Sequence, residues 1–103
     1  MTATKLYITL LLFVKEGEET FHAYEDTVLP FLDRYNGRLL YRIRPGQDAF
    51  INSADEKPYE IHLVEFGSKA DFENFRQDEE RKGYAHLFQQ SVKKAILLEG
   101  HLG

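Results

Sequence analysis

Four segments of the chain carry hydrophobic patterns that predict β-strands. Residues 5–14 (KLYITLLLFV) are almost continuously apolar and include β-branched and aromatic side chains, which is typical of a central strand covered on both faces. Residues 38–45 (RLLYRIRP) alternate between apolar and basic side chains, as in an edge strand. Residues 59–67 (YEIHLVEFG) and 94–99 (KAILLE) are predicted to form the third and fourth strands.

Strict alternation along the second strand sorts its side chains into two sets. The expected apolar face holds Leu39, Tyr41 and Ile43, and the expected basic face holds Arg38, Arg42 and Arg44.

A helix is predicted from Glu18, because apolar residues then recur every three or four positions. These residues are Phe21, Tyr24, Val28, Leu32 and Tyr35. Acidic residues crowd the first turns, near the positive end of the helix dipole. Pro30 lies inside the pattern and is expected to bend the helix, and Asn36-Gly37 is expected to end it in a left-handed conformation.

A second helix is predicted after the third strand. Ser68 followed by Asp71 resembles a capping arrangement, and the apolar pattern continues to Phe88 with an interruption or change of angle near Gly83. Residues 46–58 (GQDAFINSADEKP) form a polar connection longer than most loops, and loops of this length often carry a function.

The predicted order is β-α-β-β-α-β, which defines a ferredoxin-like α+β sandwich with an antiparallel sheet, formed by one domain over residues 1–103. Right-handed crossovers place both helices on the same face of the sheet. The other face has no helix, although the strand at 5–14 is apolar on both sides. We therefore expect a second copy of the chain to cover that face, giving a homodimer.

Composition excludes several classes of function. The chain has 17 acidic residues against 13 Lys and Arg and no concentrated basic stripe, so nucleic-acid binding is not expected. It has no cysteine, which excludes disulfides and thiolate metal sites and fits a cytoplasmic location. Its longest apolar run, Leu6 to Val14, is shorter than the roughly 20 residues that cross a bilayer, so no membrane association is expected.

The chain resembles the dimeric α/β-barrel superfamily, in particular a family of small bacterial proteins of unknown function. The likeness is carried by Val64-Glu65-Phe66 before Ser68, by the acidic break at Asp78-Glu79-Glu80 and by Leu98-Glu99-Gly100, and more loosely by Asn36-Gly37. The superfamily includes cofactor-free monooxygenases, lactone isomerases, haem-dependent enzymes and ligand-sensing domains. The resemblance therefore implies a fold and leaves the activity open.

His62, in the middle of the third strand, is the candidate catalytic acid or base, because a histidine pKa lies near neutrality. Arg42 is the candidate for steadying developing negative charge, and Arg44 could bind a ligand carboxylate or phenolate. A satisfied core histidine and an exposed basic strand face are the alternative interpretations.

Tyr7 and Glu65 are further candidates for contacting a ligand, and each could equally be structural. Glu18, His22 and Asp26 share helical spacing, but a solvated helix surface explains them better than a metal site, so no metal is predicted.

These observations predict a homodimer that binds a small, partly apolar organic molecule and transforms it, as a monooxygenase or isomerase would, without a tightly held cofactor. The alternative is a non-catalytic ligand-sensing or interaction module that uses residues 46–58 as its contact surface.

Overall fold

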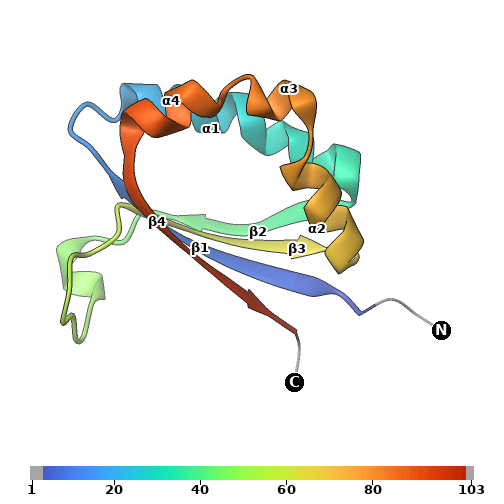
Figure 1. Ribbon diagram of the computed structural model, residues 1–103. Coiled ribbons are helices and arrows are strands. Elements are labelled where there is room, and N and C mark those ends of the chain that lie inside the picture. Colours follow the sequence, from blue (N-terminus) through green and yellow to red (C-terminus); the bar gives the residue numbers. More distant parts are fainter. Residues whose placement is uncertain (1–3, 102–103) are drawn as a thin grey trace.

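The computed structural model describes residues 4–101 and consists of one four-stranded antiparallel sheet with its α-helices on one face (Figure 1). The strands are β1 (Leu6–Val14), β2 (Gly37–Ile43), β3 (Glu60–Phe66) and β4 (Val92–Gly100). They lie in the order β2-β3-β1-β4. This arrangement confirms the predicted ferredoxin-like α+β fold.

Two helical segments connect the strands, and both lie on the same face of the sheet. The first consists of α1 (Glu19–Val28) and the 3-10 helix η1 (Leu29–Tyr35), and a second 3-10 helix, η2 (Gln47–Ala49), lies in the long connection. The second segment is divided into α2 (Lys69–Arg76), α3 (Glu79–Lys82) and α4 (Ala85–Ser91). No helix among residues 4–101 is long and apolar enough to cross a membrane.

The predicted bend at Pro30 is a change of helix type. Pro30 stands in the first turn of η1, where its missing N–H costs no hydrogen bond, and the chain tightens from α to 3-10 geometry there. Asn36 ends η1 with a left-handed φ of 56°, as predicted. Gly37 does not share that conformation, and it is needed for space instead: a Cβ there would lie 2.8 Å from Cε1 of Phe66.

The second helical segment has the predicted break near Gly83 and a further break after α2. Ser68 caps α2 as expected, since its hydroxyl accepts a hydrogen bond from the Asp71 N–H at 3.1 Å. Asp78 then starts α3 by accepting from the Arg81 N–H at 2.7 Å. The helix divides because Asp78 offers a new N-cap.

The strict alternation predicted for β2 is wrong, because an irregularity between Leu39 and Tyr41 shifts the register. Leu39 pairs with Val64 and Arg42 with His62, so both lie on the face covered by helices. Arg38 pairs with Glu65 and Tyr41 with Leu63, on the open face. One extra residue thus turns Arg42 toward the interior while keeping Leu39 in the core.

The core lies between the sheet and the helices in two clusters. One is formed by Leu6, Ile8, Leu32, Val64, Phe66 and Phe72, and the other by Leu12, Phe21 and Val92. Between them, three buried polar side chains interrupt the apolar interior: Glu25, Glu60 and His62. Their position singles out this part of the interior for closer description.

Candidate functional site

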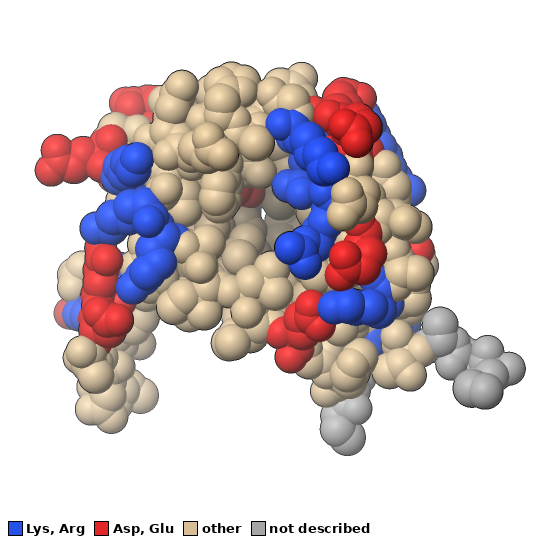
Figure 2. Space-filling view, viewed as in Figure 1, with Lys and Arg blue, Asp and Glu red and all other residues tan. Residues whose placement is uncertain are grey.

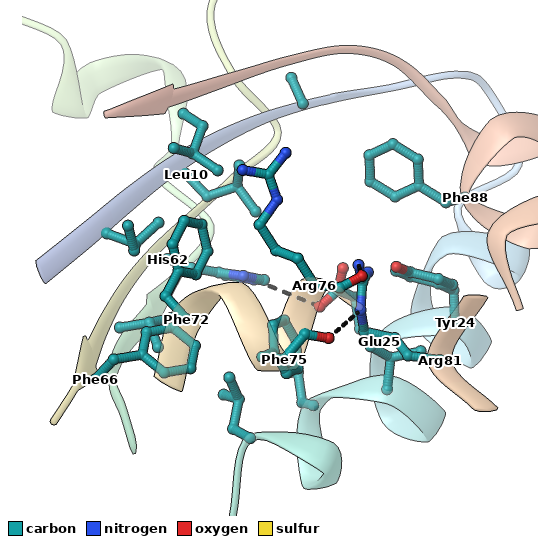
Figure 3. A pocket seen from close by; sticks show the side chains of 17 residues that line it. Leu10, Tyr24, Glu25, His62, Phe66, Phe72, Phe75, Arg76, Arg81 and Phe88 are labelled. Atoms are coloured by element: carbon teal, nitrogen blue, oxygen red, sulfur yellow. Dashed lines mark hydrogen bonds and ion pairs between the residues drawn. The ribbon is translucent and has the colours of Figure 1, made fainter. Parts of the chain in front are cut away.

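A cavity of about 340 Å³ lies between the sheet and the helices, within the size range of small-molecule sites. Its walls are mostly apolar and come from β1, β3 and β4 on one side and from α1, η1, α2, α3 and α4 on the other. Figure 2 shows the hollow at the centre of the molecule, with Lys and Arg side chains on both sides of it. The close view in Figure 3 shows His62 and Glu25 meeting at its wall.

Behind the His62 side of the cavity lies Glu60, whose side chain is fully buried at the start of β3. Its Oε2 lies 2.5 Å from Nε2 of His62 and accepts a hydrogen bond from Nε of Arg42 at 3.0 Å. Its Oε1 accepts from Nε of Arg44 at 2.8 Å. One carboxylate therefore links the histidine of the cavity to two arginines at the sheet edge.

These contacts determine the charge of Glu60. Burial alone would raise its pKa, but the hydrogen bonds from His62, Arg42 and Arg44 outweigh burial and lower the pKa from 4.5 to about 2. An ionised carboxylate can only accept hydrogen bonds, so Nε2 of His62 must carry a proton and donate it. In neutral His62 the lone pair is then on Nδ1, which makes that atom the proton acceptor of the ring.

Glu25 adds a second carboxyl group to the cluster from α1. It is 4% exposed and lines the cavity, with Oε2 3.9 Å from Nε2 of His62. Burial raises its pKa from 4.5 to about 7, against a smaller lowering by His62. A carboxyl group with this pKa exchanges protons readily near neutral pH.

The structure brings together part of the predicted site. His62 lines the cavity, whereas Arg42 and Arg44 lie behind it and contact Glu60. Arg42 Nη2 is buried with no hydrogen-bond partner among residues 4–101, a donor that a water molecule can satisfy. The two arginines are thus placed to hold Glu60 rather than to contact a ligand in the cavity.

Tyr7 and Glu65 lie on the open face of the sheet, away from the cavity. The Tyr7 hydroxyl donates to Oε2 of Glu65 at 3.1 Å, and Glu65 also forms ion pairs with Arg38 at 3.4 Å and Lys5 at 3.7 Å. A ligand between the sheet and the helices does not reach either side chain. Both are positioned instead to meet whatever covers the open face.

Sequence reasoning missed Glu25 and gave Glu60 no role. Glu25 lies on the helical face that also carries Phe21, Val28 and Leu32, so a carboxyl group in an apolar stripe was the available signal. Glu60 shares its strand face with His62 by simple alternation. His22, the histidine of the rejected metal set, has its Nε2 2.8 Å from the hydroxyl of Tyr59.

Glu25, Glu60 and His62 place one ligand atom each within 4.8 Å of one another, a spacing compatible with a metal ion. The donor set suits a cation poorly, however, because guanidinium groups already contact both oxygens of Glu60 and would repel it. The arrangement is better suited to moving protons than to holding a metal.

The fold and this buried acid–base cluster define a ferredoxin-like α+β protein with an internal cavity. No family model and no curated protein matches the chain. Solved structures do: a protein of unknown function from Rhodopseudomonas palustris, RPA0582, is 17% identical with a TM-score of 0.83, over 97% of this chain and 83% of that one.

Two further solved structures are similar in fold. A dabb family protein with a ferredoxin-like fold from Mesorhizobium loti has a TM-score of 0.71 and 12% identity, over 97% of this chain and 99% of that one. SnoaB, a cofactor-independent oxygenase from Streptomyces nogalater, has a TM-score of 0.71 and 9% identity, over 98% and 95%. At these identities the likeness establishes the ferredoxin-like α+β fold and leaves the activity open.

Proposed function

We propose that this protein is a homodimeric, cofactor-free enzyme that binds a small, partly apolar organic molecule in the cavity and moves a proton on it. The observation that supports this most is the buried cluster of His62, Glu60 and Glu25, of which His62 and Glu25 line an apolar cavity of about 340 Å³. Burying ionisable groups is costly, and such groups gather where chemistry needs them. We place the enzyme in the cytoplasm, acting without nucleic acid.

The proposed chemistry is a proton shift of the kind an isomerase performs. His62 accepts a proton from a carbon or hydroxyl group of the ligand at Nδ1, and Glu60 stabilises the imidazolium that forms. Protonated Glu25 delivers a proton elsewhere on the same ligand. The cluster returns to its starting state when His62 loses the added Nδ1 proton to solvent and Glu25 takes up a proton from solvent, while Nε2 of His62 donates to Glu60 throughout.

Arg42 and Arg44 are positioning residues in this proposal. They hold Glu60 in its ionised form, and Glu60 in turn fixes the tautomer and orientation of His62. The pairing of Arg42 with His62 across the β2–β3 ladder keeps the guanidinium next to the histidine. Arg42 therefore acts on the ligand indirectly, through Glu60 and then His62.

The homodimer is supported by the open face of the sheet. Figure 1 shows no α-helix over this face, and its two edge strands carry Tyr41, Ile43 and Leu98 with 64%, 50% and 55% of their surface exposed. Large apolar side chains exposed on an uncovered sheet face favour a partner that covers them. Two sheets packed face to face would cover these residues and give Tyr7 and Glu65 a place in the interface.

The test begins with native mass spectrometry of the purified protein, to identify a small molecule retained in the cavity. The matched variant is Ala95→Trp, which fills the cavity from β4 and is expected to lose the ligand. The identified compound is then incubated with enzyme in D₂O, and proton exchange on the ligand is followed by NMR. Wild-type protein is expected to exchange a ligand proton for deuterium.

His62→Gln and Glu25→Gln are expected to lose about 100-fold or more of this exchange rate while keeping ligand affinity, because general acid–base catalysis contributes 10²–10⁴-fold. Exchange that survives both substitutions would overturn the assigned roles. A ligand that binds wild-type protein without any exchange would support the other candidate, a non-catalytic ligand-sensing module.

A further inference from the structure

We infer that the cavity selects organic anions, with Arg76 and Arg81 at its mouth binding the anionic group while the apolar body lies inside. The inference rests on the proposed ligand-binding function and adds the class of ligand to it. A carboxylate, sulfonate or phenolate on an aromatic or alicyclic body has the required chemistry.

Arg76 lines the cavity from the last turn of α2, and about half of its side chain is exposed. Figure 3 shows the side chain extending across the opening, between Leu10 of the sheet and Phe88 of α4. Its one ion pair among residues 4–101 is a long contact of 3.9 Å to Oε1 of Glu73 on the helix surface. Such an exposed pair contributes little, so the guanidinium is free to bind a ligand.

Arg81 is held next to the same end of α2. Its Nε donates to the Phe75 carbonyl at 3.1 Å and its Nη2 to the Arg76 carbonyl at 3.0 Å, while its guanidinium carbon lies 4.8 Å from the centre of the Phe75 ring. No carboxylate among the described residues forms an ion pair with it. These contacts fix the guanidinium group at the cavity wall, next to the Tyr24 hydroxyl, on which it also acts.

The rest of the cavity determines how an anion must lie. Glu60 is ionised and Glu25 is partly so near neutral pH; Glu25 lines the cavity beside His62, and Glu60 lies behind His62. Repulsion from these carboxylates disfavours an anionic group next to His62, whereas the two guanidinium groups attract it to the part of the cavity that they line. The reactive part of the ligand, next to His62, is therefore an uncharged carbon or hydroxyl group.

The aromatic rings beside the two arginines fit the same kind of ligand. Phe72 and Phe75 line the cavity, and the guanidinium carbon of Arg76 lies 5.4 Å from the centre of the Phe72 ring. Cation–π contacts of this kind keep the guanidinium groups at the edge of an apolar surface. A flat apolar ring bearing an anionic substituent can contact the phenyl rings and the guanidinium groups together.

The test compares two fluorescent probes that differ in one group. 1-Anilinonaphthalene-8-sulfonate carries a sulfonate, and N-phenyl-1-naphthylamine is the same molecule without it. We expect the anionic probe to bind wild-type protein more tightly. We expect Arg76→Gln combined with Arg81→Gln to weaken binding of the anionic probe about tenfold or more, since only the sulfonate accepts charge-assisted hydrogen bonds from the two guanidinium groups.

Lys82→Gln is the matched control, because it removes one positive charge next to Arg81 in sequence but outside the cavity lining. It should leave both probes unchanged, and the double variant should leave the neutral probe unchanged. Circular dichroism of each variant establishes that it is folded. Ala95→Trp, which fills the cavity, should abolish the binding of both probes.

Two results would overturn the inference while leaving the cavity as a binding site. One is equal affinity for both probes in wild-type protein, and the other is an anionic probe insensitive to loss of Arg76 and Arg81. If neither probe binds wild-type protein, or if Ala95→Trp leaves both affinities unchanged, the proposed ligand-binding function fails together with the inference.

Discussion

At the scale of residues, the buried polar cluster is organised by the carboxylate of Glu60, which has no exposed surface. Glu60 is stabilised by three hydrogen-bond donors, two of which come from partly exposed arginines that retain contact with water. A buried ion pair of this kind adds little net stability, but removing one member is costly because the others lose their partner. Alternation along β3 is enough to predict that Glu60 and His62 share a strand face. The contact between Glu60 and Arg42 depends on the bulge in β2, which alternation does not reveal.

Glu60→Gln should lower the free energy of unfolding by about 2 kcal/mol, because a neutral amide cannot balance the guanidinium groups of Arg42 and Arg44. Urea unfolding at pH 7 measures this change. Glu65→Gln on the open face is the control and should cost less than about 1 kcal/mol, since its cationic partners are exposed. Equal losses in the two variants would contradict the central role of Glu60.

Glu25 predicts a dependence of stability on pH. Its folded pKa, raised by burial to about 7, exceeds the ordinary value of 4.5, so the folded state binds the proton more tightly. The resulting stabilisation is fully present below pH 4.5 and is lost as the pH rises through 7. His62 and Arg42 lower the pKa of Glu25, whereas Glu60 and Asp26 raise it further.

Glu25→Gln should remove this loss. A pKa raised from 4.5 to about 7 corresponds to roughly 3 kcal/mol at most, so the variant should gain stability relative to wild-type protein between pH 5 and pH 8. Thermal unfolding across this range measures the difference. A stability difference between the two proteins that stays constant from pH 5 to pH 8 would show that Glu25 does not titrate there.

At the scale of elements, the hydrophobic pattern was sufficient to predict all four strands and both helical segments. It failed where one residue changes the geometry. Alternation cannot reveal a bulge, because the extra residue near Leu40 leaves the pattern RLLYRI looking regular. The second helical segment breaks after Arg76 because Asp78 acts as the N-cap of a new helix instead of continuing α2.

Asn36 allows the left-handed end of η1 to be tested. Asn36→Ala should lower the free energy of unfolding by about 1–2 kcal/mol, because a φ of 56° is strained for alanine. The substitution also removes the 3.3 Å hydrogen bond from the side-chain amide to Asp71. Asn36→Gly loses the same hydrogen bond without the strain, so it should be the more stable of the two variants in chemical unfolding. The reverse order would contradict this account of the helix end.

At the scale of the whole molecule, the two faces of the sheet have different roles. The sequence predicted that helices cover one face and a second copy the other, but it could not assign side chains to either face. That assignment requires the strand register, which places His62 in the interior and sends Tyr7 and Glu65 to the open side. The cavity could not be predicted, because its volume depends on how the short helices pack over the sheet.

Leu98→Asp should convert the proposed dimer into a monomer. Leu98 pairs with Thr9 on the open face and is 55% exposed in the single chain, so a charge there would be buried in a face-to-face dimer. Sedimentation velocity distinguishes the two states. Gln90→Asp adds the same charge on α4, on the helical side of the molecule, and should leave the dimer intact. A wild-type protein that sediments as a monomer would contradict the proposed assembly.

The central claim is that the cavity beside His62 is a ligand site. An X-ray crystal structure of protein purified without added ligand tests it most directly. We predict electron density for a small organic molecule between His62 and the opening at Arg76, with its apolar part against the phenylalanines of the wall. An interior closed by the protein's own side chains, or one that holds only water, would contradict the claim.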